Sequence, residues 1–555
     1  TEIYTLSLHD ALPISGLDYS DFLLDQLSGK GRGSATGTWG HRSWRSSLFV
    51  QDDWKVTQSF TVNVGLRWEY AQPLYEVADR QVNVDTYTGR LMYAGKDGNS
   101  RALYNGYWKQ FMPRIGLAWT PQALNNKLVL RAGYAYMSFM EGTGANLRTT
   151  LNPPFFLETD FSYDSRTPGS ITKGFADVVS SNILLDMARP ASAGVVPQLQ
   201  GRAWDQNLRP QTTSQINLTA EYQFDKATSL SAAYVSQKGT HLVAPHEANQ
   251  PLAGTGPYAT WTNLNLRRPL INVLPNLGNI ALTEASATMD YNALQMSGRR
   301  RFSGGLEFLA SYTFGKTLTD NLGYYGGGFT AGEGAYWQNA YDRRANRGPA
   351  FFDVQHNFTL GGLYDLPVGK GKKFGSSMNK AADLVFGGWN VNYTVMARTG
   401  FPITVLAGAD RTGQAVRGNV RANAFGNIQG NDSLVNVDNF FGLPTDTASR
   451  GSYFCGIGLN NGACPYGQPN FGEFGTAGIG TERGPSFFSL DYSIGKKFNV
   501  TESNYLDFRA EFFNGLNHVS WGAPGRTLSA PASFGAVTSQ VQGPRVIQFG
   551  LKYHF

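Results

Sequence analysis

Charged residues are scarce in this chain, and long apolar runs are missing from it. Only 16% of the 555 residues are charged, whereas about 25% are charged in an average globular protein. No run approaches the roughly 18 apolar residues that a membrane-spanning helix requires, which excludes a helical membrane protein. The formal net charge of +6 is small for this length, and the basic residues are dispersed. A nucleic-acid-binding protein is therefore not expected.

Cysteine is almost absent as well. Only Cys455 and Cys464 occur, close together in the segment CGIGLNNGAC. This spacing predicts a small loop closed by a disulfide bond in an oxidising compartment, although two unrelated free thiols would give the same pattern. The histidines stand singly and make no metal-ligand spacing, so the sequence indicates neither a metal site nor a cofactor.

Aromatic residues and glycine, by contrast, are abundant. The chain has 35 Phe, 27 Tyr and 65 Gly, and its mean hydropathy is −0.29. Many aromatic side chains with little charge and a polar average suit a transmembrane β-barrel, because half of each strand faces a polar interior.

The clearest periodic segment is SFTVNVGLRWEY, residues 59–70. One alternate set of side chains is apolar or aromatic throughout, and the other contains polar side chains such as Arg67 and Glu69. Twelve residues of unbroken alternation exceed the usual strand length of about 5–6 residues. The segment therefore predicts a long strand that lies between an apolar and a polar medium.

The last twelve residues, PRVIQFGLKYHF (544–555), alternate in the same way. Phe549, Leu551, Tyr553 and Phe555 share the apolar face. The segment fits the last strand of an outer-membrane β-barrel, which needs about 9–11 residues to cross the bilayer and ends in an aromatic girdle. Taken alone, it could also be an edge strand of a soluble β-sandwich.

Similar segments recur along the chain, and about thirteen strands are expected in total. Besides the two segments above, the expected strands are 41–56, 110–120, 127–137, 215–224, 228–238, 292–302, 306–314, 353–366, 389–398, 487–498 and 505–514.

The connections between these strands alternate between short turns and long loops. The short turns lie near residues 57, 123, 226, 303, 375 and 501, and the long loops span 71–107, 138–212, 239–287, 317–350, 399–484 and 517–543. This asymmetry predicts an all-β fold, a transmembrane antiparallel up-and-down β-barrel with short periplasmic turns and long extracellular loops. The C-terminus is then expected on the periplasmic side of an outer membrane of the Gram-negative type.

The number and direction of the expected strands indicate whether they can close a barrel by themselves. The first strand, 41–56, and the last strand both run from the long-loop side, whereas an antiparallel barrel closes on an even number of strands. At least one ascending strand is therefore expected upstream of residue 41, unless residues 16–28 supply it. The chain would then hold about 13–14 strands of a larger barrel.

The first residues are not expected to belong to the native protein. Residues 1–15, TEIYTLSLHDALPIS, lack the basic region and cleavage site of a signal peptide and resemble a translated sequencing adapter. Residues 16–40 are predicted to form a loop or partial strand, with a possible short helix first and a flexible glycine-rich stretch at 29–40. The barrel is expected to span 41–555.

Several long strings resemble the family of Oar-like TonB-dependent receptors, in the order in which that family has them. They are FVQDDWKVTQSFTVNVGLRWEY (49–70), FFDVQHNFTLGGLYDLPVGKGKKF (351–374), TGFPITV (399–405), GPSFFSLDYSIGKKF (484–498), LDFRAEFFNGLNHVSWGAP (506–524) and the C-terminal PRVIQFGLKYHF. The resemblance implies a barrel of about 22 strands in the whole protein, of which this chain would be the C-terminal portion. The family's plug domain, carboxypeptidase-regulatory-like domain and TonB box have no counterpart in this sequence.

Function and partners follow from the same resemblance. It implies an outer-membrane receptor that binds and imports an unidentified substrate and is coupled to the TonB complex through the missing N-terminal part. Outer-membrane lipid and the barrel-assembly machinery would be further partners, the latter acting on the strand that carries Phe549, Leu551, Tyr553 and Phe555. Two alternatives stay open: a structural or adhesive outer-membrane barrel that displays its loops, and a soluble all-β carbohydrate-binding protein.

Charged residues in the inward set of the strands are the candidate contacts for a substrate or a plug. They are Arg67, Glu69, Arg131, Glu221, Asp507, Arg509 and Glu511. Ion pairs that stabilise the wall are an equally good interpretation of the same pattern. An enzyme is not expected, because the one suggestive carboxylate pair, Asp52 and Asp53, consists of strand neighbours that point in opposite directions. The carboxylates of glycosidases instead lie about 5–10 Å apart across a cleft.

Overall fold

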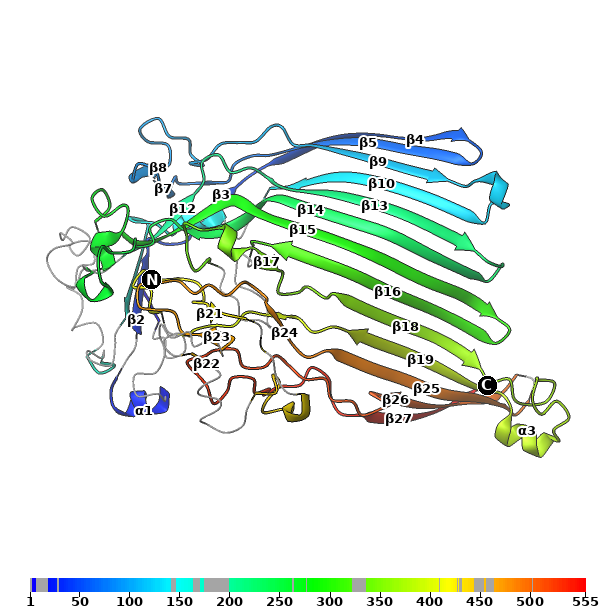
Figure 1. Cartoon of the computed structure of the whole chain (residues 1–555). Helices are drawn as coiled ribbons and strands as arrows, with labels where there is room; N and C mark the ends of the chain where they lie inside the picture. The colour runs from blue at the N-terminus through cyan, green and yellow to red at the C-terminus, as the bar shows by residue number, and fades with distance from the viewer. Residues whose placement is uncertain are drawn as a thin grey trace.

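One large antiparallel sheet with a folded layer of loops at one end makes up the computed structural model (Figure 1). The residues that the structure describes are 2–5, 18–26, 29–140, 146–162, 170–173, 199–261, 264–275, 277–321, 336–408, 410–426, 428, 432–443, 454–455, 464–501 and 503–555.

Thirteen long strands form this sheet, here called the wall, and each pairs with its neighbour in antiparallel register. In order across the wall they are β4 (Arg45–Thr57), β5 (Phe60–Ala71), β9 (Phe111–Trp119), β10 (Leu128–Phe139), β13 (Gln211–Gln223), β14 (Thr228–Glu247), β15 (Leu277–Ser303), β16 (Leu306–Thr319), β18 (His356–Asp365), β19 (Trp389–Arg398), β25 (Phe487–Asn499), β26 (Tyr505–Phe513) and β27 (Val546–His554). Each strand expected from alternation is present, so the predicted antiparallel all-β fold is confirmed.

Short and long connections lie at opposite ends of the wall (Figure 1). One end holds the C-terminus and the turns that follow β4, β9, β13, β15, β18 and β25. The long loops lie at the other end. These are called the short-turn end and the long-loop end. The predicted separation of short turns from long loops is confirmed, and it gives the wall two chemically different ends.

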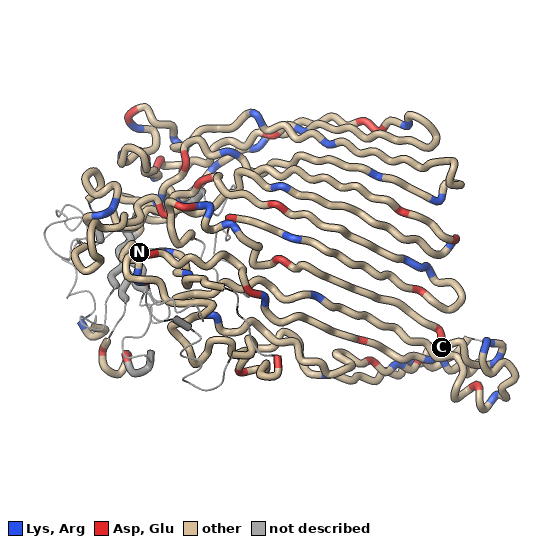
Figure 2. Tube along the Cα trace, viewed as in Figure 1, with Lys and Arg blue, Asp and Glu red and all other residues tan. Residues whose placement is uncertain are grey.

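The wall also has two different faces, because residues paired on neighbouring strands share a face. Val62 pairs with Leu117 on one face, whereas the next residue, Asn63, pairs with Gly116 on the other. The apolar side is called the outer face and the polar side the inner face. Leu218 on the outer face is 50% exposed, and charged residues are thinly spread along the wall strands in Figure 2. A broad exposed apolar face is what strands in a bilayer require.

The wall ends in two strands that have one neighbour each among the described residues. β4 pairs with β5, and β27 pairs with β26. Both edge strands run from the long-loop end to the short-turn end, so antiparallel closure between them requires an odd number of further strands. Residues 16–28 do not supply one, because the described part of that segment holds the helix α1 (Asp18–Leu23).

The long loops fold into a layer, here called the cap, which covers the long-loop end. Its strands are β1 (Glu2–Thr5), β2 (Gly29–Ala35), β3 (His41–Arg42), β6 (Tyr75–Glu76), β7 (Val82–Asp85), β8 (Arg90–Tyr93), β11 (Phe156–Ser162), β12 (Leu199–Trp204), β17 (Gly348–Pro349), β20 (Pro402–Ile403), β21 (Asn423–Ala424), β22 (Phe454–Cys455), β23 (Tyr466–Gly467) and β24 (Glu482–Arg483). Its short 3-10 helices are η2 (Asn146–Thr150), η3 (Tyr258–Thr260), η4 (Leu264–Arg267), η5 (Arg344–Asn346) and η6 (Asp432–Leu434), whereas η1 (Gln122–Leu124) lies in the turn between β9 and β10 at the short-turn end. None of the described helices has the length and apolar character that crossing a membrane would take.

Apolar cores hold the cap together. One of them contains Val405, Tyr466 and Phe534, and it therefore joins the loop after β19 to the loop after β26. Another packs Tyr104 against Trp204, which are far apart in sequence. The long loops thus support each other, which their length and composition did not predict.

Two wall strands continue far into the cap. β14 has 20 residues and β15 has 27, whereas crossing a bilayer takes about 9–11. At about 3.3 Å per residue, β15 is about 90 Å long. In the cap, β12 pairs with β15 in parallel. The predicted strands 228–238 and 292–302 are therefore the parts of β14 and β15 nearest the short-turn end.

Three elements differ from the sequence-based prediction. The first wall strand begins at Arg45 rather than at residue 41, because His41–Arg42 pairs with β6 in the cap. The stretch 29–40, predicted as a flexible loop, begins with β2, which is held by pairing with β1 and β11. The turn near residue 375 contains an unexpected helix, α3 (Lys380–Phe386). Whether residues 1–15 are native stays a prediction.

Candidate functional site

The inner face of the wall carries all seven charged residues predicted to contact a substrate or plug. They are Arg67, Glu69, Arg131, Glu221, Asp507, Arg509 and Glu511. Arg67 Nε lies 2.5 Å from Glu69 Oε1, and Arg131 Nη1 lies 2.9 Å from Glu221 Oε2. Arg509 Nη1 lies 3.4 Å from Glu511 Oε1, and Asp507 lies between Lys497 and Lys552 in the strand register. This geometry supports ion pairs within the wall, and contact with a substrate or plug stays a prediction.

Two hollows open on the inner face near these charges. One, of about 390 Å³, is lined by Arg114, Gly116 and Gly133. Because the two glycines have no side chains, they leave space beside the Arg114 guanidinium. The other, of about 290 Å³, is lined by Asp491 and Glu511. A basic and an acidic recess therefore lie on different parts of the inner face.

Four buried carboxylates in the cap are each paired with an arginine. With their shortest O···N distances, the pairs are Glu76–Arg80 (2.7 Å), Asp353–Arg483 (2.6 Å), Glu247–Arg417 (3.2 Å) and Asp320–Arg343 (3.2 Å). None of the four carboxylate residues is more than 3% exposed. Two of the pairs join residues 130 and 170 positions apart in the chain, so no local sequence pattern could have predicted them.

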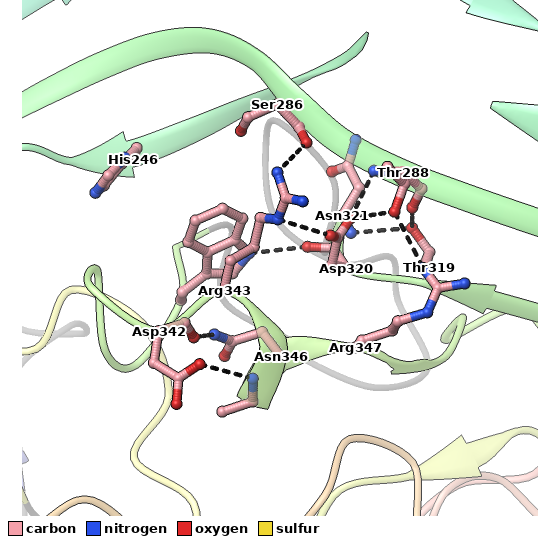
Figure 3. A network of polar contacts seen from close by, with 12 residues as sticks. His246, Ser286, Thr288, Thr319, Asp320, Asn321, Asp342, Arg343, Asn346 and Arg347 are labelled. Atoms are coloured by element: carbon pink, nitrogen blue, oxygen red, sulfur yellow. Dashed lines mark hydrogen bonds and ion pairs between the residues drawn. The ribbon is translucent and has the colours of Figure 1, made fainter. Parts of the chain in front are cut away.

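Asp320 is at the centre of the network shown in Figure 3. Its Oδ1 accepts a hydrogen bond from the backbone N–H of Thr288 at 2.6 Å, and its Oδ2 lies 3.2 Å from Arg343 Nε. Its carbonyl oxygen accepts a hydrogen bond from Trp337 Nε1 at 2.8 Å. Arg343 in turn donates to the carbonyl oxygen of Ser286 at 2.5 Å. One carboxylate thus fixes β15, the end of β16 and the loop that follows β16.

Glu247 plays a similar part where β14 ends in the cap. Its Oε1 accepts hydrogen bonds from the backbone N–H groups of Asn249 (3.1 Å) and Ile280 (2.7 Å), and its Oε2 lies 3.2 Å from Arg417 Nη1. Burial lowers the pKa of the neighbouring Arg268 to about 10, an effect that the charge of Glu247 opposes. These buried groups support the cap from within and are not exposed to a ligand.

Glu76 organises the first long loop. Its carboxylate accepts hydrogen bonds from the backbone N–H groups of Gly40 (3.2 Å), Ala78 (2.8 Å) and Arg80 (3.0 Å), and from Arg80 Nη2 (2.7 Å). Burial alone would raise the pKa of Glu76, but the hydrogen bonds from Arg80, Gly40 and Ala78 lower it from 4.5 to about 2. The ionised carboxylate is therefore the form that holds this loop.

Replacing Glu76 with Gln is expected to open this loop. At least about 1.5 kcal/mol of local stability should be lost, because hydrogen bonds to a charged group are replaced by weaker ones. The folded-state pKa lies below the unfolded value, so the stabilisation is full above about pH 4.5 and is lost as the pH falls toward about 2. Amide hydrogen exchange of residues 77–81 measures both effects. The control is Asp79→Asn, whose partner Arg101 is exposed; an equal effect there would contradict the prediction.

A cluster of aromatic and arginine side chains lies on the cap, with Tyr258 and Phe471 exposed and the other members half-buried. The ring centroid of Tyr258 lies 5.1 Å from that of Trp261 and 5.4 Å from that of Phe471. The guanidinium of Arg267 lies 4.8 Å from the ring centroid of Trp261, and that of Arg411 lies 5.7 Å from that of Phe471. The cluster brings together the loop after β14 and the loop after β19. Stacked rings beside guanidinium groups suit planar, sugar-like or anionic ligands.

Glycines allow this aromatic–arginine cluster to form. A Cβ atom at Gly254 would lie 2.4 Å from Trp261 Cγ, and one at Gly413 would lie 2.7 Å from Tyr258 Cε2. Only a residue without a side chain therefore leaves room for these rings. The only sequence signal is the high content of glycine and aromatic residues, which does not show which of these residues meet.

The remaining predicted site residues lie as follows. Phe549, Leu551, Tyr553 and Phe555 are 70%, 67%, 48% and 96% exposed. The first three share the outer face through their register with β26, and their role in barrel assembly stays a prediction. Cys464 is buried and disulfide-bonded, whereas the side chain of Cys455 lies outside the described residues, so the Cys455–Cys464 bond stays a prediction. Within the described ranges, no group of three or more His, Cys, Asp or Glu side chains could hold a metal ion.

Comparison with known proteins gives one family and several structures. The family model described as "Outer membrane beta barrel domain" matches residues 5–548. No match was found among curated proteins.

Three solved structures illustrate the structural similarity. The ferripyoverdine receptor of the outer membrane of Pseudomonas aeruginosa has a TM-score of 0.39 and 10% identity, covering 95% of this chain and 39% of that chain. The siderophore receptor PirA from Acinetobacter baumannii has a TM-score of 0.41 and 12% identity, covering 99% and 50%. The FrpB iron transporter from Neisseria meningitidis has a TM-score of 0.39 and 10% identity, covering 95% and 52%. The present chain spans about half the length of these proteins or less.

Proposed function

Since the chain belongs to the outer membrane beta barrel domain family, we propose that it is the barrel of an Oar-like TonB-dependent receptor. Its cap captures a substrate outside the cell, and its polar interior passes the substrate to the periplasm. The observation that carries the proposal is the combination of a two-faced wall with a packed cap at one end of it only. A polar interior surface below a ligand-accessible cap is the arrangement that import needs.

The whole receptor would contain more strands than this wall. The two edge strands, β4 and β27, run in the same direction, so an odd number of further strands is required between them. A barrel of about 22 strands is the size of plugged outer-membrane transporters. The TonB complex would act on a plug and TonB box in the N-terminal part of such a receptor, and the inner-face charges would contact that plug or the substrate.

The proposed orientation places the cap outside the cell and the short turns and C-terminus in the periplasm. Long loops face the exterior and short turns face the periplasm in bacterial barrels of this type. The outer face then contacts lipid, and β27 presents its exposed aromatic residues to the assembly machinery.

The substrate contact proposed on the cap is the cluster of Tyr258, Trp261 and Phe471 with its two arginines. It is partly exposed, through Tyr258 and Phe471, and it joins two loops. Its rings and guanidinium groups offer stacking together with positive charge. The second candidate function is an adhesive barrel, which the packed cap also favours, because a rigid cap can present a binding surface without transport.

One experiment in cells tests location and transport together. A membrane-impermeant maleimide is expected to label Tyr87→Cys, in the cap and 96% exposed, on intact cells. It should label Lys226→Cys, in the turn between β13 and β14, only after the outer membrane is permeabilised. Cells that carry the whole receptor, with the plug and TonB box in its N-terminal part, are then offered a panel of ferric siderophores, glycans and peptides. Uptake of one class is expected, and it should stop when a protonophore removes the energy for TonB coupling.

The outcomes separate the candidates. Binding that persists with protonophore and is never followed by uptake would favour the adhesive barrel. Labelling of Lys226→Cys on intact cells would reverse the orientation, and a chain found in the soluble fraction would overturn both candidates. Trp261→Ala should weaken binding of the transported class, with Tyr87→Ala, also exposed on the cap, as the matched control.

A further inference from the structure

The connection between β18 and β19 is the longest at the short-turn end, and it projects from the wall (Figure 1). It spans residues 366–388 and contains the helix α3. Four of its large apolar side chains are exposed: Phe374 (55%), Leu384 (55%), Val385 (57%) and Phe386 (61%). A water-exposed turn has no need of such a concentration of apolar surface.

Side chains of the outer face hold α3 in place. Lys496 of β25 pairs in register with Trp389 and Phe508, so it belongs to the outer face. Its Nζ donates hydrogen bonds to the carbonyl oxygens of Asp383 (3.1 Å) and Leu384 (2.6 Å) in the last turn of α3. The charge of Lys496 also suits the negative end of the helix. As a result, Lys496 is only 4% exposed, and the helix rests against the side of the wall that faces lipid.

Aromatic residues continue this contact along the wall. Trp389 Nε1 donates a hydrogen bond to the carbonyl oxygen of Val385 at 2.8 Å. The ring of Trp389 packs edge-on against Phe498 and Phe508, with centroid distances of 6.5 and 6.2 Å. Aromatic residues at this level of a barrel mark the interface between hydrocarbon and head groups. The exposed side chains of α3 are therefore continuous with the lipid-contacting surface.

The same connection is strongly basic. Its charged residues are Lys370, Lys372, Lys373, Lys380 and Asp383, and Figure 2 shows the blue segments in the projecting turn. Asp383 is turned inward within the connection, since its Oδ1 accepts a hydrogen bond from the backbone N–H of Lys370 at 2.6 Å. The four lysines are exposed. Exposed lysines beside exposed apolar side chains are the pattern of a segment that lies in a membrane surface.

We propose that residues 366–388 anchor the short-turn end of the wall in the adjacent lipid leaflet by binding anionic phospholipid. Phe374, Leu384, Val385 and Phe386 enter the acyl-chain region, and the lysines contact the phosphate groups. The inference rests on the proposed function, because it takes the outer face to lie in an outer membrane with the short turns at its phospholipid leaflet. It adds a specific lipid contact outside the wall strands.

Fluorescence quenching in vesicles tests this anchor. Bimane is attached to Phe386→Cys in the full chain, in which Cys455 and Cys464 are replaced by serine, and the chain is inserted into phosphatidylcholine vesicles. Lipids brominated on the acyl chain are expected to quench the label strongly, as at Leu551→Cys on the outer face. A label at Lys226→Cys, in another turn at the same end, should be quenched mainly by aqueous iodide.

The lysines are tested by the charge of the quenching lipid. Brominated phosphatidylglycerol should quench the Phe386→Cys label more than brominated phosphatidylcholine does, and the combined substitution of Lys370, Lys372, Lys373 and Lys380 by Gln should abolish that preference. Iodide quenching at residue 386 together with lipid quenching at Leu551 would overturn the anchor while the barrel stands, and would point to a periplasmic protein as the partner. Absence of lipid quenching at Leu551 would instead refute insertion of the wall, and with it the proposed function.

Discussion

Replacing Asp353 with Ala is expected to release the cap strand β24 from the wall near β16 and β18. Asp353 is 2% exposed, and its Oδ2 lies 2.6 Å from Arg483 Nη2. Its Oδ1 also accepts a hydrogen bond from the backbone N–H of Thr317 at 2.6 Å. Removing the carboxylate leaves the buried N–H of Thr317 without its acceptor and the Arg483 guanidinium without its charged partner. Because the Arg483 side chain is 35% exposed, the loss should be smaller than for a fully buried ion pair, at about 1–3 kcal/mol, the cost of leaving a buried donor unsatisfied.

The loss should be local to the cap. Arg483 also donates to the carbonyl oxygens of Asp353 (3.0 Å) and Gly400 (3.3 Å), so the start of the 399–484 loop should open with it. The wall strands keep their own ladders and should not unfold. Hydrogen exchange of residues 400–406 and 479–484 in the detergent-solubilised chain is the measurement. Exchange there should accelerate by a factor of about ten or more, since about 1.4 kcal/mol corresponds to a factor of ten.

An exposed ion pair provides the control for Asp353. Arg509 and Glu511 lie 3.4 Å apart, with the Arg509 side chain 54% exposed. Glu511→Ala should change stability by at most about 1 kcal/mol, because solvent screens the pair. Equal effects at Asp353 and Glu511 would show that the cap does not depend on its buried carboxylates.

The sequence predicts the wall well because each wall strand separates two media. β13 alternates without a break, and its register confirms Ile216, Leu218 and Tyr222 on one face and Asn217 and Glu221 on the other. Apolar and polar residues alternate with a period of two only where one face of the strand contacts an apolar medium and the other contacts water. The lengths of the connections then distinguish the short-turn end from the long-loop end. The number of wall strands, their order and the face on which each side chain lies can therefore be predicted from the sequence.

Alternation fails in the cap because both sides of a strand are buried there. In the cap part of β15, Ile280 and Ala287 are 0% exposed and Ala281 is 1% exposed, although they lie on different faces. β14 is further disturbed by irregular pairing near Gly239 and by His241, whose φ is 55°. Of the 27 residues of β15, only the part from 292 to 302, nearest the short-turn end, therefore showed a periodic pattern in the sequence.

The candidate site is predicted less well than the wall, because its contacts join distant segments. The seven inner-face charges follow from register, but the arginine partners of the buried carboxylates depend on how the loops pack. One close approach does coincide with the resembling strings TGFPITV and GPSFFSLDYSIGKKF: a Cβ on Gly400 would lie 1.8 Å from the carbonyl oxygen of Gly484. Each string thus contains one residue of this loop contact. Neither string by itself shows that Gly400 approaches Gly484. The helix α3 was missed although Asn379 caps its N-terminus locally, by accepting a hydrogen bond from the backbone N–H of Ala382. Two carbonyl groups of its last turn depend on a distant residue, Lys496, more than 100 positions away.

Two adjacent substitutions on β13 test whether the outer face lies in lipid. Leu218 is 50% exposed on the outer face, near the middle of the segment between the cap and the short turn, and it pairs with Ala132 and Tyr234. Leu218→Arg is expected to destabilise the folded chain in vesicles by about 2–4 kcal/mol, the effect of arginine at the bilayer midplane. The neighbouring Asn217→Arg places the same side chain on the hydrated inner face. It should lose little beyond the hydrogen bond that Asn217 accepts from Thr219, about 1 kcal/mol.

The difference between these two variants distinguishes a membrane wall from a soluble sheet. In a soluble protein Leu218 would already face water, so arginine there would be neutral within about 0.5 kcal/mol. Urea titration of the chain in vesicles, followed by the mobility of unheated samples on denaturing gels, measures both variants under one condition. A larger loss at residue 218 than at residue 217 requires an apolar medium against the outer face, because the two side chains differ only in the face from which they project. A neutral Leu218→Arg variant would mean that this face is in water, and the import function built on it would fail with it.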